Sequence, residues 1–321
     1  MAWMARAVEV AATARRVASP NPWVGAVLVT STGAAHEGAT AAPGGPHAEV
    51  SALAAAGGEA RGATMYVTLE PCSHHGRTPP CADAVIAAGV ARVVVGVEDP
   101  DERVAGAGIQ RLQEAGIAVE VGVRAEEVAA QLAPYLKHRR TGRPWVVLKL
   151  AATMDGRTAA PDGTSRWITG DAARDDAHRL RAESDAVLVG AGTVRSDDPE
   201  LTVRRVEGRD PLRVVLGTAP AGARVHPAVE VDGDLGDVLD DLGRRGVLQL
   251  LVEGGAGVAH EFHAAGLVDR YVLYLAPALM GGDDGHPLLA GPGAPTLAGA
   301  WRGRIVDVAR VGEDLRVELE G

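Results

Sequence analysis

Residues 68–81 read Thr-Leu-Glu-Pro-Cys-Ser-His-His-Gly-Arg-Thr-Pro-Pro-Cys, and the assignment of the fold starts from this segment. It begins at the end of an apolar, extended run and ends where a helix is expected to start. It contains both cysteines of the chain, Cys72 and Cys81, nine positions apart. Upstream, His47 and Glu49 open an Ala-rich helical stretch after Pro46. One imidazole and two thiols are therefore expected to meet in one site.

This site is predicted to bind zinc through His47, Cys72 and Cys81. Zinc accepts nitrogen and sulfur ligands at tetrahedral angles, and three protein ligands leave a fourth position for water, which is typical of a catalytic site. Bound zinc lowers the pKa of that water from about 15.7 towards 7. Glu49 can reach the same pocket without being a ligand and is predicted to act as general acid and base. A single His or Cys is more often a structural residue than a metal ligand. The prediction therefore depends on the His, the Glu and both cysteines occurring together at this spacing.

The pattern matches the zinc deaminase signature, a His-x-Glu followed by Pro-Cys and a second Cys, except that the second Cys follows after nine residues instead of three. The inserted loop joins two metal ligands and is expected to lie over the substrate pocket. We interpret its His74 and His75 as possible substrate contacts, because further protein ligands would displace the water. Arg77 has a planar donor fork suited to a phosphate or pyrimidine oxygen, and a solvated loop cation is the alternative.

The length of 321 residues favours two domains. Helical and strand-like segments alternate throughout, which predicts α/β domains with helices on both faces of a sheet. A basic, turn-rich stretch at 137–144 marks the expected boundary, giving domains 1–142 and 143–321. Residues 219–243, rich in Gly, Asp and Ala, are the least regular part.

Charge and composition exclude several classes of protein. The net charge is −10, divided as −2 before Arg143 (12 basic, 14 acidic) and −8 from there on (20 basic, 28 acidic). Aromatic residues make up 3 %, so both phosphate-backbone binding and base stacking are disfavoured. No run of about 18 apolar residues is present, and the amino terminus lacks the unbroken apolar stretch of a signal peptide. The chain has only two cysteines, which suits a reducing compartment, so we expect a cytoplasmic protein. From its charge, aromatic content and apolar runs, we expect it to bind neither nucleic acid nor membrane.

Residues 68–81, together with Pro-Asn-Pro-Trp-Val-Gly at 20–25 and Pro-His-Ala-Glu at 46–49, resemble the bifunctional deaminase/reductase of riboflavin biosynthesis. The resemblance continues through Leu-Lys-Leu-Ala-Ala-Thr-Met-Asp-Gly-Arg-Thr at 148–158 and Asp-Asp-Pro-Glu-Leu-Thr-Val-Arg at 197–204. It implies a cytidine-deaminase-like α/β/α sandwich followed by a dihydrofolate-reductase-like α/β domain. The implied reactions are zinc-dependent deamination of 2,5-diamino-6-ribosylamino-4(3H)-pyrimidinone 5′-phosphate and NADPH-dependent reduction of the ribosyl group of the product to ribityl. It also implies a homodimer.

The resemblance implies site residues in both domains. Cofactor contacts are implied for Ala151, Trp167, Thr193, Asp197, Gly255, Ala256, Gly257 and Val258. Substrate contacts are implied for Asn21, Ser165, Arg181, Leu201, Arg204 and Glu253. Thr218 is a further candidate for the cofactor, although Gly217-Thr218 stands where the family usually has an Asp followed by a small polar residue.

The glycines that follow the strand-like residues 248–252 are themselves typical of a phosphate-binding turn, apart from the resemblance. A Gly-rich turn between a strand and a helix lets a phosphate approach free backbone N–H groups, although such turns are often only tight connections. Positions 254–259 read Gly-Gly-Ala-Gly-Val-Ala, so the G-x-G-x-x-G fingerprint of a Rossmann domain is absent.

Two other functions remain open at this point. The first is a zinc deaminase acting on nucleic acid such as transfer RNA, with an unrelated carboxy-terminal domain. The long loop between Cys72 and Cys81, the few aromatics and the acidic balance argue against it. The second is a zinc-stabilised binding protein without catalysis, for which Glu49 would have no chemical role.

Overall fold

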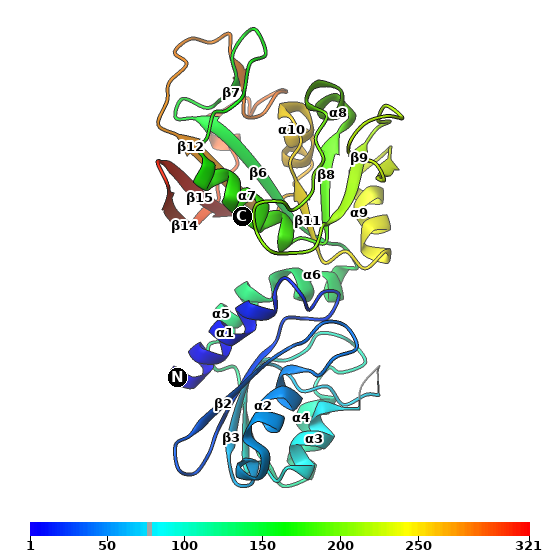
Figure 1. The fold of residues 1–321 in the computed structure, drawn as a ribbon, viewed down its shortest axis with the longest axis vertical. Helices are drawn as coiled ribbons and strands as arrows, with labels where there is room; N and C mark the ends of the chain where they lie inside the picture. The colour runs from blue at the N-terminus through cyan, green and yellow to red at the C-terminus, as the bar shows by residue number, and fades with distance from the viewer. Residues whose placement is uncertain (76–78) are drawn as a thin grey trace. The chain divides into compact units, whose positions relative to one another are not determined.

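The computed structural model describes residues 1–75 and 79–321, and these form two units, Met1–Gly142 and Arg143–Gly321. The first unit is built on one five-stranded sheet in the order β2-β1-β3-β4-β5. Figure 1 labels β2 and β3 of this sheet. β1 is antiparallel to β2 and β3, whereas β3, β4 and β5 are parallel. The strands are β1 (Gly25–Val29), β2 (Ala35–Ala39), β3 (Thr64–Leu69), β4 (Arg92–Val97) and β5 (Ala118–Val121).

Helices cover both faces of this sheet. Two glycines allow the closest approaches: a Cβ on Gly25 of β1 would lie 2.1 Å from the backbone oxygen of Ala7, and one on Gly38 of β2 would lie 2.2 Å from that of Ala48. The helices are α1 (Ala2–Ala14), α2 (Ala48–Ala56), the short 3-10 helix η1 (Gly57–Ala60), α3 (Cys81–Ala87), α4 (Ala107–Glu114), α5 (Ala125–Gln131) and α6 (Ala133–Thr141). The predicted α/β/α sandwich is therefore confirmed for this unit.

The second unit is built on an eight-stranded sheet in the order β10-β9-β8-β11-β6-β12-β15-β14. The strands from β10 to β12 are parallel, and β15 and β14 add an antiparallel pair at one end. The strands are β6 (Trp145–Thr153), β8 (Ala186–Gly190), β9 (Leu212–Leu216), β10 (Val229–Val231), β11 (Gln249–Val252), β12 (Arg270–Ala276), β14 (Arg304–Val311) and β15 (Asp314–Glu320). The short strands β7 (Arg157–Ala159) and β13 (His286–Pro287) form a separate pair.

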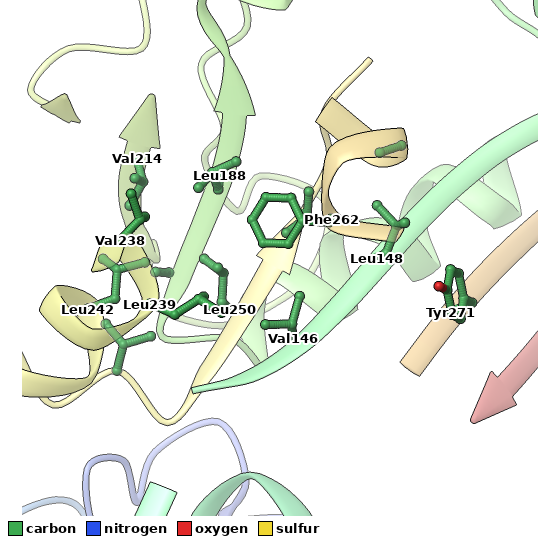
Figure 2. Close-up of a cluster of buried hydrophobic side chains, with 14 of the residues drawn as sticks. Val146, Leu148, Leu188, Val214, Val238, Leu239, Leu242, Leu250, Phe262 and Tyr271 are labelled. Atoms are coloured by element: carbon green, nitrogen blue, oxygen red, sulfur yellow. The ribbon is translucent and has the colours of Figure 1, made fainter. Parts of the chain in front are cut away.

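Two apolar layers enclose the second sheet because strand residues alternate between its faces. Val146 and Leu148 of β6 pack with Phe262 on one face (Figure 2), whereas Val147, between them, belongs to the cluster on the other face. The first layer includes residues of α9 and α10, and the second includes residues of α7 and α8. The helices are α7 (Asp171–Ala182), α8 (Ala191–Asp197), α9 (Leu235–Arg244) and α10 (Ala256–Ala264), with a 3-10 turn, η2 (Leu297–Gly299).

Some elements are not predicted by the sequence pattern. β10 and most of α9 lie within residues 219–243, and Asp234 caps α9 by accepting hydrogen bonds from the N–H groups of Gly236 and Asp237. The hairpin of β14 and β15 and the half-exposed β2 are also unpredicted, because their polar residues hide the alternation. In the part of the chain that the structure describes, no helix has the length and apolar character needed to cross a membrane.

Candidate active sites

The structure brings His47, Cys72 and Cys81 together in the first unit. His47 precedes the first residue of α2, Cys72 follows β3, and Cys81 is the first residue of α3. The Nδ1 atom of His47 lies 3.2 Å from Sγ of Cys81 and 3.7 Å from Sγ of Cys72. The backbone N–H of Cys81 donates to Sγ of Cys72 over 3.3 Å. All three ligand atoms lie within 4.8 Å of one another.

These distances fit a zinc ion. Tetrahedral Zn–S and Zn–N bonds of about 2.3 and 2.1 Å place the two ligand atoms about 3.5 Å apart, close to the separations of His47 from both cysteines. A side-chain hydrogen bond with the Cys81 thiol lowers the pKa of Cys72, which favours the thiolate that zinc requires. The same hydrogen bond, together with burial, raises the pKa of Cys81. The donor set and its spacing are therefore those of a zinc site with three protein ligands.

A cavity of about 130 Å³ lies beside this cluster. Glu49, on the first turn of α2, lines it and is 4 % exposed. Burial raises the pKa of Glu49 to about 7, and the charge of Cys72 acts in the same direction. Asn21 and His74 also line the cavity, and Nδ1 of His74 is buried without a hydrogen-bond partner among the described residues. The predicted contact Arg77 lies outside the residues that the structure describes.

Glu70 supports this cavity, and sequence reasoning missed it. Its buried carboxylate accepts hydrogen bonds from the N–H groups of Asp99, Gly106, Gly108 and Ile109 over 2.9–3.2 Å. It thereby ties the end of β3 to the loop after β4 and to the first turn of α4. The sequence did offer a signal for Glu70. It is a charged residue at the end of a buried strand, and a buried charge needs hydrogen-bond partners.

In the second unit, the implied cofactor residues gather at one edge of the sheet. Parallel strands end at the same edge, and Thr193, Thr218 and Gly255 follow β8, β9 and β11 there. The N–H of Gly255 donates to Oγ1 of Thr193 over 3.2 Å. α10 begins at Ala256, so Ala256, Gly257 and Val258 form its first turn. Asp197 ends α8, and its backbone oxygen accepts a hydrogen bond from Arg166 over 2.9 Å.

The implied substrate residues of this unit are already partly engaged with one another. Arg181 of α7 forms two hydrogen bonds with Glu253, just after β11. The N–H of Arg204 donates to Nδ1 of the buried His178 over 3.1 Å, and its guanidinium pairs with Glu200. Leu201 is buried with a positive φ of 54°.

A second cavity, of about 270 Å³, is lined by Ser165 and Trp167. Trp167 is 68 % exposed, and the Arg174 guanidinium lies 4.1 Å from the centre of its ring. Ala151 is half-buried on β6, two residues before the strand reaches Thr153, which also lines this cavity.

Lys149 of β6 is a functional candidate that sequence reasoning missed. Burial lowers its pKa, while the nearby charge of Glu253 opposes this effect. Lys149 in turn helps to lower the pKa of Glu253 to about 2, although burial works against this and the charge of Arg181 contributes more. A lone Lys inside an apolar strand was the signal, because a buried ammonium requires an anionic partner or ligand.

Comparisons with known proteins agree with this arrangement. Residues 1–97 match the family described as the cytidine and deoxycytidylate deaminase zinc-binding region, and residues 144–317 match the RibD C-terminal domain. The riboflavin biosynthesis protein RibD of Escherichia coli is 41 % identical over 99 % of this chain and 98 % of its own length. RibD of Acinetobacter baumannii has a solved structure with 38 % identity and a TM-score of 0.92, covering 99 % of this chain and 97 % of its own.

A third relative, from Thermotoga maritima, is described as a diaminohydroxyphosphoribosylaminopyrimidine deaminase/5-amino-6-(5-phosphoribosylamino)uracil reductase. Its structure is 36 % identical with a TM-score of 0.89, and the match covers 99 % of this chain and 97 % of that one. The chain is thus a zinc-binding deaminase domain followed by a dihydrofolate-reductase-like reductase domain. It belongs to the RibD family, the bifunctional deaminase/reductases of riboflavin biosynthesis.

Proposed function

We propose that the first unit deaminates 2,5-diamino-6-ribosylamino-4(3H)-pyrimidinone 5′-phosphate hydrolytically. We further propose that the second unit reduces the ribosyl group of 5-amino-6-(5-phosphoribosylamino)uracil to ribityl with NADPH. The observation that carries the proposal is the buried Glu49 in the cavity beside His47, Cys72 and Cys81. Both steps act on small pyrimidine ribotides, and we place them in the cytoplasm, where the thiols stay reduced.

In the first unit, Glu49 is the proposed catalytic acid and base. Zinc held by the three ligands supplies a water of lowered pKa. Glu49 would accept a proton from the attacking water and pass it to the ring nitrogen. It would then take the remaining proton of the hydroxyl formed on the ring carbon and pass it to the amine, which leaves as ammonia. Asn21 and His74, which line the same cavity, are placed to hold the pyrimidine by hydrogen bonds.

In the second unit, the carboxyl edge of the parallel strands is the proposed site for NADPH and the ribosyl group. The first turn of α10 offers backbone N–H groups, and Gly257 there has open space around its Cβ position, so a cofactor phosphate can approach the backbone. NADPH supplies the hydride when bound. Lys149 and the ion pair of Arg181 with Glu253 then orient the polar groups of the substrate. Ser165, Leu201 and Arg204 complete the proposed substrate contacts.

Two measurements on the purified, zinc-loaded protein test these assignments. Glu49→Gln should keep one zinc per chain by elemental analysis but lose ammonia release, by about 10²-fold or more. Oxidation of NADPH should require the deaminated ribotide and should not occur with dihydrofolate. A Glu49→Gln protein that still releases ammonia at the wild-type rate would refute the role of Glu49, and NADPH oxidation with dihydrofolate would refute the second assignment.

We also propose that the chain forms a homodimer through β14. This eight-residue strand is at the edge of its sheet and exposes Ile305 and Val308, 60 % and 56 % respectively. An exposed apolar edge strand is a ready surface for pairing with a second copy. Ile305→Lys with Val308→Lys should halve the mass measured by light scattering, whereas Val17→Lys, at an exposed site in the other unit, should not. A wild-type monomer would refute the proposal.

A further inference from the structure

Two arginines line the deaminase cavity. Arg103 lies in the loop after β4, and Arg139 lies on α6. Both also line a neighbouring, more open hollow of about 560 Å³, as does Asp101. The three residues therefore form a wall shared by the two hollows. Neither arginine is one of the residues implied by the motifs discussed above.

Asp101 holds these two cations in place. Nε and Nη2 of Arg103 donate to its two carboxylate oxygens over 2.9 and 2.7 Å, and Nε of Arg139 lies 3.7 Å from Oδ2. The hydrogen bonds from Arg103 lower the pKa of Asp101 to about 2, so it is charged at neutral pH. One carboxylate thus orients two guanidinium groups at the wall shared by the two hollows.

Arg139 is fixed by its surroundings although its donors are not saturated. Its guanidinium lies 5.1 Å from the centre of the Tyr135 ring, and the Tyr135 hydroxyl donates to Asp99 over 3.0 Å. Asp99 also accepts the N–H of Asp101 over 2.9 Å, so the same carboxylate positions both partners of Arg139. Nε of Arg139 is buried and has no hydrogen-bond partner in residues 1–75 and 79–321. The Arg139 side chain is 28 % exposed, and a pre-positioned guanidinium that keeps some access to solvent is suited to an oxyanion.

We propose that Arg103 and Arg139 bind the 5′-phosphate of the deaminase substrate, a subsite that rests on the function proposed above. The inner cavity, about 130 Å³, is well below the roughly 300–1,000 Å³ of pockets that enclose whole drug-sized ligands. It therefore accommodates the pyrimidine beside Glu49, while the pentose extends to the wall and its phosphate reaches the two arginines. The chain thereby selects a ribotide over the corresponding riboside.

Kinetics with the ribotide and its dephosphorylated riboside test the subsite. Arg103→Met and Arg139→Met should each raise KM for the ribotide by about tenfold or more, because each removes charge-assisted hydrogen bonds to phosphate. We expect kcat with the ribotide to change by less than about twofold and the riboside kinetics to stay as in the wild type, which also shows that the variants fold. Arg92→Met, at an exposed ion pair with Glu120, is the control and should change neither. Equal losses with both substrates, or no loss with either, would overturn the proposal.

A binding measurement separates this proposal from the proposed reaction. Ribose 5-phosphate is titrated into the zinc-loaded full-length chain by calorimetry, in an Arg204→Met background that removes the guanidinium of Arg204 from the proposed substrate contacts of the second unit. Adding Arg139→Met should weaken its affinity by about tenfold or more, to that of ribose. Unchanged affinity would overturn the subsite. If the wild type released no ammonia from the ribotide, the proposed reaction would fail, and this titration would still decide the subsite.

Discussion

Arg181 donates two hydrogen bonds to Glu253, from Nε to Oε1 over 2.5 Å and from Nη2 to Oε2 over 2.9 Å, and thereby joins α7 to the end of β11. The two side chains are 14 % and 9 % exposed. Both were implied as separate substrate contacts, but the structure makes them one bidentate pair. Their first role is to compensate each other's buried charge at the edge where the cofactor and substrate residues gather.

Arg181→Met should therefore destabilise the second unit by about 3–5 kcal/mol, because it leaves the Glu253 carboxylate buried without its partner. The double variant Arg181→Met/Glu253→Gln should recover part of that loss. Arg245→Met, which removes an exposed pair with Asp241, is the control and should cost less than about 1 kcal/mol. Scanning calorimetry of the transition that does not respond to zinc measures all three, and equal costs for Arg181→Met and Arg245→Met would contradict the prediction.

Zinc removal should separate the two activities. The ligands His47, Cys72 and Cys81 all belong to the first unit, so a chelator should abolish ammonia release and leave NADPH oxidation with the deaminated ribotide intact. Adding zinc back should restore ammonia release. The thermal transition of the first unit should rise with zinc, since a ligand of the folded state stabilises it. Parallel loss of both activities on chelation would contradict this expectation.

Glu70→Gln should destabilise the first unit by about 2–6 kcal/mol. One carboxylate oxygen becomes an amide nitrogen, which leaves two of the four backbone N–H donors without an acceptor at about 1–3 kcal/mol each. Glu120→Gln, at the exposed pair with Arg92, is the matched control and should stay within about 1 kcal/mol. The zinc-responsive calorimetric transition reports both variants. Equal losses of stability in Glu70→Gln and Glu120→Gln would show that the Glu70 hydrogen bonds do not stabilise the first unit.

His178 should make the second unit less stable in mild acid. Burial, with the charges of Arg181 and Arg204, lowers its pKa from 6.5 to about 4. The folded state thus favours the neutral ring, whose stabilisation is complete above pH 6.5 and is lost as the pH falls towards 4. At pH 5 the loss is about 2 kcal/mol. His178→Gln keeps an acceptor for the Arg204 N–H without titrating, so its stability should fall less between pH 7 and 5; parallel curves would contradict the assignment.

The zinc site was predictable because each of its ligands lies next to the end of a helix or strand. A His before one helix, a Cys after a strand and a Cys at the start of the next helix are brought together by the sheet, and the structure places His47, Cys72 and Cys81 accordingly. The sandwich of the first unit was predictable from the alternation of apolar segments. The residue contacts of the second unit were implied by resemblance, and their roles remain predictions.

Other features depend on tertiary contacts that no local pattern reveals. Lys149 lies in an apolar strand, and its closeness to Glu253 arises because β11 pairs with β6 from about a hundred residues away. The hydrogen bonds of Glu70 join it to residues 29 to 39 positions downstream. α9 was not predicted because its glycines and aspartates mask an apolar face that becomes clear only where Leu239 and Leu242 are buried.

The strand order of the second sheet determines how long β6 waits for its pairing strands while the chain is being translated. β6 is made first, yet both of its neighbours, β11 and β12, follow only after roughly 100 further residues have been translated. Until then the backbone N–H and C=O groups of this nine-residue apolar segment lack the strands that pair with them in the folded protein. Residues 1–142, in contrast, already contain every strand of their own sheet. Chaperones that bind emerging chains are expected to be needed most during that interval.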